Sequence, residues 1–68
     1  MTINERIREI REKNNWSRRE FAEIVGMSRQ EIYLIDYGAT NPTITTLRKI
    51  ADALDIDLTD LIRKEEDK

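Results

Sequence analysis

The chain has 68 residues, enough for one small domain, and carries a net charge of -2 at pH 7. It contains no cysteine and no histidine, which excludes disulfides, thiolate metal sites and the commonest general base. Because no long apolar run occurs, neither a signal peptide nor a membrane span is expected, and we expect a soluble cytoplasmic domain.

The first predicted helix begins after Thr2. Thr2 and Glu5 have the spacing of a capping box, in which each side chain bonds the backbone N–H of the other residue. The stripe of apolar residues that follows at helical spacing consists of Ile3, Ile7 and Ile10. This stripe ends at residues 14–15, which predicts the end of the helix there.

Residues 17–38 have the pattern of two short helices joined by a tight turn. Ser17 and Ser28 each begin a capping box whose partner is the glutamate three residues later. Gly26 stands where the first of these helices must end, because glycine adopts the left-handed conformation there without steric cost. This pattern predicts a helix-turn-helix, whose second helix can enter the DNA major groove.

Two more helices are predicted in the C-terminal half. Asn41 before Pro42 disfavours helix and predicts a loop, after which Thr43 caps a fourth helix. Asp57 caps a short fifth helix. We assign residues 1–64 to the domain and residues 65–68 to a charged tail with nothing to bury.

The predicted fold is all-α, with five short helices around one apolar core. The residues predicted to form this core are Ile7, Ile10, Trp16, Phe21, Ala22, Val25, Ile32, Ile35, Leu47, Ile50 and Leu54. The helix-turn-helix is formed by the second and third helices.

A set of residues at fixed spacings runs from the second helix to the fourth. These residues are Ser17-Arg18…Phe21-Ala22, Gly26, Ser28…Ile32…Ile35-Asp36-Tyr37-Gly38, Asn41-Pro42, and Leu47…Ile50-Ala51…Leu54. Over about sixty residues the chain resembles the Cro/repressor-type, or Xre, family of helix-turn-helix domains. The resemblance implies a compact lambda-repressor-like domain of five helices that binds operator DNA as a homodimer and regulates transcription. Arg18 departs from the family, which commonly has a DNA-contacting glutamine at this position.

The third helix carries the residues predicted to contact bases. Arg29 and Gln30 lie in its first turn, where arginine can pair with guanine and glutamine with adenine. Tyr33 follows on the same side and can meet a thymine methyl group. Alternatively, Arg29 and Gln30 are ordinary solvated residues of a surface helix.

A second set of polar residues is predicted to contact the DNA backbone. These residues are Arg18, Arg19, Ser28, Thr40 and Asn41. The two arginines begin a helix, whose backbone N–H groups also favour phosphate, although they could instead pair with acids such as Glu23. The alternative for Asn41 is turn formation. Glu31 would repel phosphate, so we expect it to fold back onto Ser28 within the capping box.

A single recognition helix makes too few contacts for useful specificity. We therefore expect a homodimer that places two recognition helices about 34 Å apart on an inverted repeat. Leu58 and Ile62 of the fifth helix are the predicted dimer interface.

The alternative function is a protein-interaction module, diverged or redesigned, on the same scaffold. It is motivated by the net charge, by Glu31 and by the bulky residues Tyr33, Leu34 and Tyr37. Against it, residues 1–30 carry seven lysines and arginines and only five glutamates, so this part can still meet phosphates.

No catalytic residue, cofactor, small-molecule ligand or metal site is expected. The acidic residues that could suggest a cation site are Asp52, Asp55, Asp57 and Asp60. They lie at helix ends without a glycine-bearing calcium loop, which favours caps and solvated faces. No nucleophile and base stand at a spacing typical of an enzyme.

Overall fold

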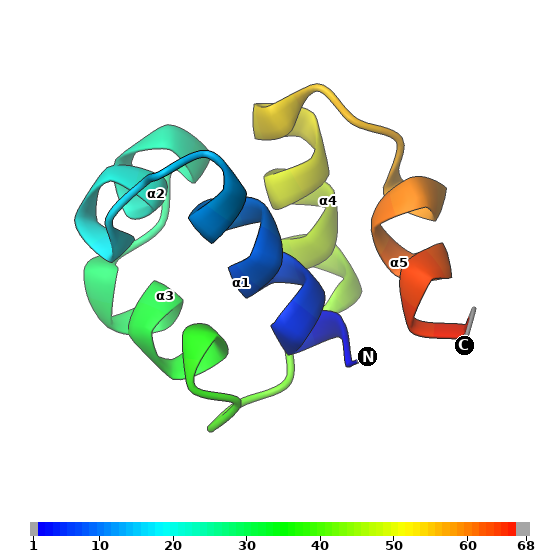
Figure 1. The fold of residues 1–68 in the computed structure, drawn as a ribbon, viewed down its shortest axis with the longest axis horizontal. Helices are drawn as coiled ribbons and strands as arrows, with labels where there is room; N and C mark the ends of the chain where they lie inside the picture. Colours follow the sequence, from blue (N-terminus) through cyan, green and yellow to red (C-terminus); the bar gives the residue numbers. More distant parts are fainter. Residues whose placement is uncertain (1, 67–68) are drawn as a thin grey trace.

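Five helices make up the chain in the computed structural model, which describes the backbone of residues 2–66 and the side chains of residues 2–62 (Figure 1). The helices are α1 (Ile3–Lys13), α2 (Arg18–Val25), α3 (Arg29–Asp36), α4 (Ile44–Leu54) and α5 (Leu58–Glu66). Residues 2–66 contain no strand. The predicted all-α fold of five helices is confirmed.

The capping signals form as predicted. In α1 the Thr2 hydroxyl accepts the N–H of Glu5 at 3.1 Å, and the Glu5 carboxylate accepts the N–H of Thr2 at 2.9 Å. The same reciprocal pair begins α2 and α3, and Thr43 caps α4. Each pair satisfies backbone N–H groups that have no partner within the helix, so the helices begin where these residues stand.

The turn between α2 and α3 depends on Gly26. This residue has φ +72° and ψ +36°, the left-handed conformation expected of a helix C-cap. A Cβ atom added there would meet no atom within 4 Å, so the backbone angle rather than space requires glycine. The N–H groups of Gly26 and Met27 both donate to the carbonyl of Ala22, which closes the turn.

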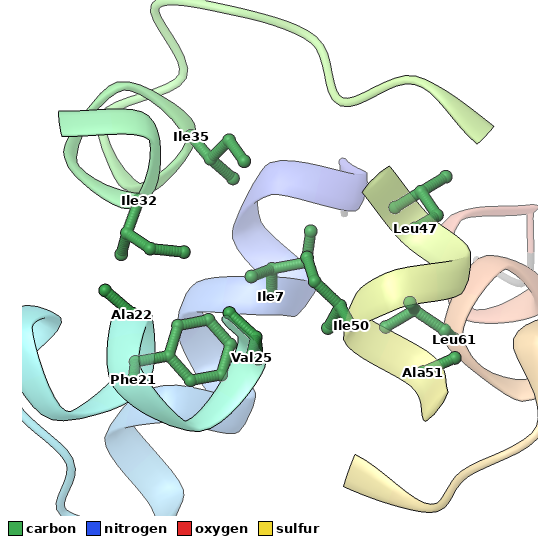
Figure 2. Close-up of a cluster of buried hydrophobic side chains, with 10 residues drawn as sticks. All are labelled: Ile7, Phe21, Ala22, Val25, Ile32, Ile35, Leu47, Ile50, Ala51 and Leu61. Carbon is green, nitrogen blue, oxygen red and sulfur yellow. The ribbon is translucent and has the colours of Figure 1, made fainter. Parts of the chain in front are cut away.

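The apolar core lies where the helices converge (Figure 2). α1 packs against α3 and α5, α2 packs against α3 and α4, and α4 packs against α5. The buried residues are Ile7, Phe21, Ala22, Val25, Ile32, Ile35, Leu47, Ile50, Ala51 and Leu61. Side chains from all five helices therefore share one core, which holds α3 in place from its inner side.

The predicted core needs correction at its edges. Ile10, Trp16 and Leu54 are only partly buried and pack around the core. Ala51, which belongs to the apolar stripe predicted for the fourth helix, and Leu61, which the predicted core omitted, are almost fully buried. Leu61 is buried because α5 folds back against α1 and α4, a contact that helical periodicity alone does not indicate.

α5 ends close to the predicted domain boundary. The helix runs to Glu66, two residues past the boundary expected at residue 64. Residues 67–68 of the predicted charged tail lie outside the described residues. Among the helices of residues 2–66, none combines the length and apolar character that a bilayer crossing requires.

Candidate nucleic-acid interface

The outer side of α3 presents the residues predicted to contact bases. Its inner side is buried through Ile32, Ile35 and Asp36. Arg29 and Gln30 are exposed in the first turn, and Tyr33 is 52% exposed one turn later. Because residues three or four positions apart share one side of a helix, these three side chains form a continuous exposed face. The structure thus brings together the whole set predicted to read bases.

The residues predicted to contact the DNA backbone are spread around this face. Arg19 is exposed in the first turn of α2, and its Nε lies 3.7 Å from a carboxylate oxygen of Glu23. Such an exposed ion pair contributes little to stability and leaves Arg19 available. Thr40 and Asn41 are exposed beside the C-terminal part of α3, where they line a shallow groove of about 220 Å³ together with Leu34.

Ser28 and Glu31 form the capping box that was predicted. The Glu31 carboxylate accepts the backbone N–H of Ser28 at 3.0 Å and its hydroxyl at 3.1 Å. The hydrogen bond from the Ser28 backbone lowers the pKa of Glu31 below its ordinary value. The negative charge of Glu31 is therefore held at the beginning of α3, and the Ser28 hydroxyl is already in use.

A buried carboxylate lies behind the outer face of α3. The Asp36 side chain is only 3% exposed and accepts two hydrogen bonds from Arg11 of α1, each at 3.1 Å. It also accepts the Nε–H of Arg18 in α2 at 2.9 Å. Arg11 further donates to the carbonyl of Trp16 at 2.9 Å. This network joins α1, α2 and α3 through one charged group.

Arg18 lies against two tyrosines, Tyr33 on the outer face of α3 and Tyr37 at its C-cap. Its Cζ is 5.7 Å from the ring centroid of Tyr33 and 4.9 Å from that of Tyr37. The two rings meet edge to face with centroids 4.6 Å apart. The hydrogen bond to Asp36 raises the pKa of Arg18 further above neutrality, so its charge is constant. Arg18 and Tyr33, predicted for separate roles, are thus in contact.

Asn4 is another buried polar residue that the sequence patterns did not indicate. Its Nδ2 donates to the carbonyl of Ile35 at 3.0 Å and to that of Thr40 at 2.8 Å. These bonds tie the beginning of α1 to the end of α3 and to the following loop. The spacing of Asn4, Ile7 and Arg11 could have indicated this burial, because the three residues share one side of α1, and all three are buried.

Leu58 and Ile62, the predicted dimer interface, are partly buried against the core of their own chain. Part of their apolar surface is therefore used within the domain. Among the described residues no group of acidic side chains has the arrangement of a metal site.

Residues 7–61 match the family described as helix-turn-helix. The chain is 31% identical over 65 residues to an immunity repressor protein of Bacillus phage phi105, and the match covers 96% of the chain and 45% of that repressor. The chain thus spans less than half the length of this relative. No solved structure matches the chain.

Proposed function

The chain belongs to the helix-turn-helix family, and on this basis we propose that it binds duplex DNA in a sequence-specific manner as a repressor-like, non-enzymatic regulator of transcription. The observation that carries the proposal is the outer face of α3, where Arg29, Gln30 and Tyr33 are exposed together on a helix whose inner side is fixed by the core. Similarity to a phage immunity repressor supports the regulatory role.

We propose that α3 enters the major groove and contacts base edges. Arg29 donates to guanine O6 and N7, and Gln30 pairs with adenine N6 and N7. Tyr33, one turn further along, contacts a thymine methyl group. Each well-formed two-bond contact contributes about 1–3 kcal/mol of discrimination between bases.

Contacts with the DNA backbone are proposed for residues around this face. Arg19, Thr40 and Asn41 are exposed and can donate to phosphate oxygens. Ser28 can donate through its hydroxyl only by turning away from Glu31. Arg18, also predicted to contact phosphate, is held by Asp36 and has less freedom to follow a phosphate than Arg19.

We further propose that the chain binds as a homodimer to an inverted repeat. The chain measures 29 × 24 × 23 Å, so one copy is smaller than the separation of about 34 Å between successive major grooves on one side of DNA. Two copies are needed to occupy both grooves. The proposed contact lies on α5 and includes Leu58 and Ile62, which retain partial exposure.

Selection from a randomised duplex DNA library at about 0.1 M salt, where exposed charges are partly screened, tests this function. The expected result is a short inverted repeat whose half-site spacing reports the geometry of the dimer. Recovery of no sequence above background would contradict the proposal.

The double variant Arg29→Ala with Gln30→Ala tests the residues that read bases. We expect affinity for the selected operator to fall at least about 30-fold, because two base contacts are lost. Affinity is measured by titration with labelled duplex. Arg48→Ala, which removes an exposed arginine of α4, is the matched control. Unchanged affinity in the double variant would show that other residues read the DNA.

The second candidate function is a protein-interaction module. It is favoured by the exposure of the large apolar residues Tyr33 and Leu34 on α3 and Tyr37 at its C-cap. Salt distinguishes the two functions, because binding to phosphates weakens steeply as salt rises, whereas burial of an apolar surface responds little.

A further inference from the structure

Arg18 connects the interior of the domain to the outer face of α3. We propose that Arg18 is a positioning residue, which orients Tyr33 and Tyr37 for contact with operator DNA and does not itself serve as a phosphate contact. This inference rests on the proposed function, since it concerns how the same surface reads DNA.

The inner end of this connection is rigidly held. Asp36 is buried, and both of its carboxylate oxygens are bonded to Arg11. The 2.9 Å bond from Arg18 Nε to Asp36 therefore ends on a fixed acceptor. Because a guanidinium is planar, a bond at its Nε edge also restricts the plane of the whole group.

The outer end of the connection is the pair of tyrosines. Both rings lie within the distance of about 6 Å at which a cation is attracted to an aromatic face. Arg18 Nη2 also lies 3.4 Å from the Tyr37 hydroxyl. Tyr33 and Tyr37 are 52% and 59% exposed, so contacts with the core restrain them little. Arg18 and the edge-to-face contact between the rings therefore limit which conformations the tyrosines adopt.

Arg18 is less available to a phosphate than Arg19, because its Nε and Nη2 are already bonded and its side chain is only 39% exposed. Turning the whole guanidinium outward would break its bond to the buried carboxylate and its contacts with the two rings. Arg19, the next residue, is 72% exposed and only loosely paired with Glu23 at 3.7 Å. The two neighbouring arginines thus have different roles, with Arg19 available to phosphate and Arg18 committed to the protein.

The experiment compares Arg18→Ala, Arg18→Lys and the control Arg19→Ala. Lysine keeps the positive charge that a phosphate contact needs, but it lacks the planar group that bonds Asp36 while stacking on two rings. A positioning role predicts that Arg18→Lys behaves like Arg18→Ala, whereas a phosphate contact predicts that lysine restores binding. All three variants should fold, because Asp36 keeps its bonds to Arg11, and backbone amide NMR spectra verify this.

The first readout is the NMR shifts of the tyrosine ring protons in the DNA-free protein. Ring shifts of both Tyr33 and Tyr37 should move in the two Arg18 variants and stay in place in Arg19→Ala. Unmoved shifts in Arg18→Ala would overturn the inference, since the rings would then be oriented without Arg18.

The second readout is affinity for the selected operator and for a scrambled duplex over a range of salt concentrations. Both Arg18 variants should bind the operator about tenfold more weakly, with unchanged affinity for the scrambled duplex and an unchanged slope of log affinity against log salt. Arg19→Ala should weaken binding to both duplexes and reduce that slope by about 0.9. A reduced slope in Arg18→Ala that Arg18→Lys restores would overturn the inference.

Failure of the proposed function gives a different result. If the unmodified chain binds no duplex specifically, the proposed function and the DNA-reading role of the tyrosines both fail. The ring shifts would still confirm or overturn the contact by which Arg18 orients them.

Discussion

Asp36 shows how one residue in the interior connects three helices. A buried carboxylate has lost its water, and its charge is tolerated only where partners replace that hydration. Arg11 supplies two hydrogen bonds, and Arg18 supplies one at the exposed edge. Arg11 is itself nearly buried, so the Arg11 and Asp36 charges each replace part of the hydration that the other has lost.

Substitution Asp36→Asn is expected to lower the free energy of unfolding by about 3 kcal/mol, because it removes the only buried counterion of Arg11 among the described residues and leaves the exposed Glu12 carboxylate, 3.7 Å away, as its remaining acidic partner. Urea unfolding at pH 7 measures the change. The control Arg18→Ala removes only the more exposed partner and should cost no more than about 1 kcal/mol. Equal losses in the two variants would show that burial of Arg11 does not govern the stability of the network.

At the scale of the helices, the residues that begin and end a helix lie within a few positions of it in the sequence. The reciprocal bonds between Ser28 and Glu31 are formed inside the first turn of α3, so they favour that helix before any packing occurs. The negative charge of Glu31 also lies at the positive end of the helix dipole. α3 is therefore stabilised locally by the acidic residue in its first turn.

The free energy of unfolding is expected to fall in acid, partly because Glu31 becomes protonated. Its pKa is lowered in the folded chain by the bond from the Ser28 backbone, while the unfolded chain has an ordinary value of about 4.3. The unfolded state therefore binds more protons in this range. The contribution is complete above about pH 4.3 and disappears as the pH falls through the lowered pKa.

Thermal unfolding between pH 3 and pH 7 tests this expectation. Glu31→Gln keeps a hydrogen-bond acceptor but does not titrate, so the melting temperature of this variant should depend less on pH than that of the unmodified chain. An identical pH dependence in the two proteins would contradict the assignment. Glu5, whose pKa is lowered by the bond from the Thr2 backbone, accounts for part of the dependence that remains.

At the scale of the whole molecule, α5 completes the core. It is separated from α1 by most of the chain, and yet the two helices pack against each other. Leu61 is 0% exposed at this contact, whereas Leu58 is only partly buried. A domain this small has few buried side chains, so the loss of one is a large part of its stability.

Leu61→Ala is therefore expected to lower the free energy of unfolding by about 2–5 kcal/mol, since it leaves a cavity among α1, α4 and α5. Leu58→Ala, on the same helix, should cost clearly less. Chemical denaturation of both variants at equal protein concentration measures the difference. A smaller loss for Leu61 than for Leu58 would mean that α5 is held mainly through its outer side, as in a dimer.

The sequence by itself determined the helices and the turn between α2 and α3. Capping boxes and Gly26 act through bonds between residues at most about five positions apart, so a local pattern is sufficient to recognise them. The exposed positions of Arg29, Gln30 and Tyr33 followed from the helical period and from the apolar residues on the opposite side.

Tertiary structure alone decided the contacts that join the helices. Arg11 and Arg18 lie 25 and 18 residues from Asp36, and Asn4 lies 31 residues from Ile35. The local sequence around a polar residue on a helix does not distinguish a solvated side chain from one with a buried partner, because the packing of distant segments decides which side chains lose their water. For this reason the pattern assigned Arg18 to phosphate, whereas the fold places it between a buried carboxylate and two tyrosines.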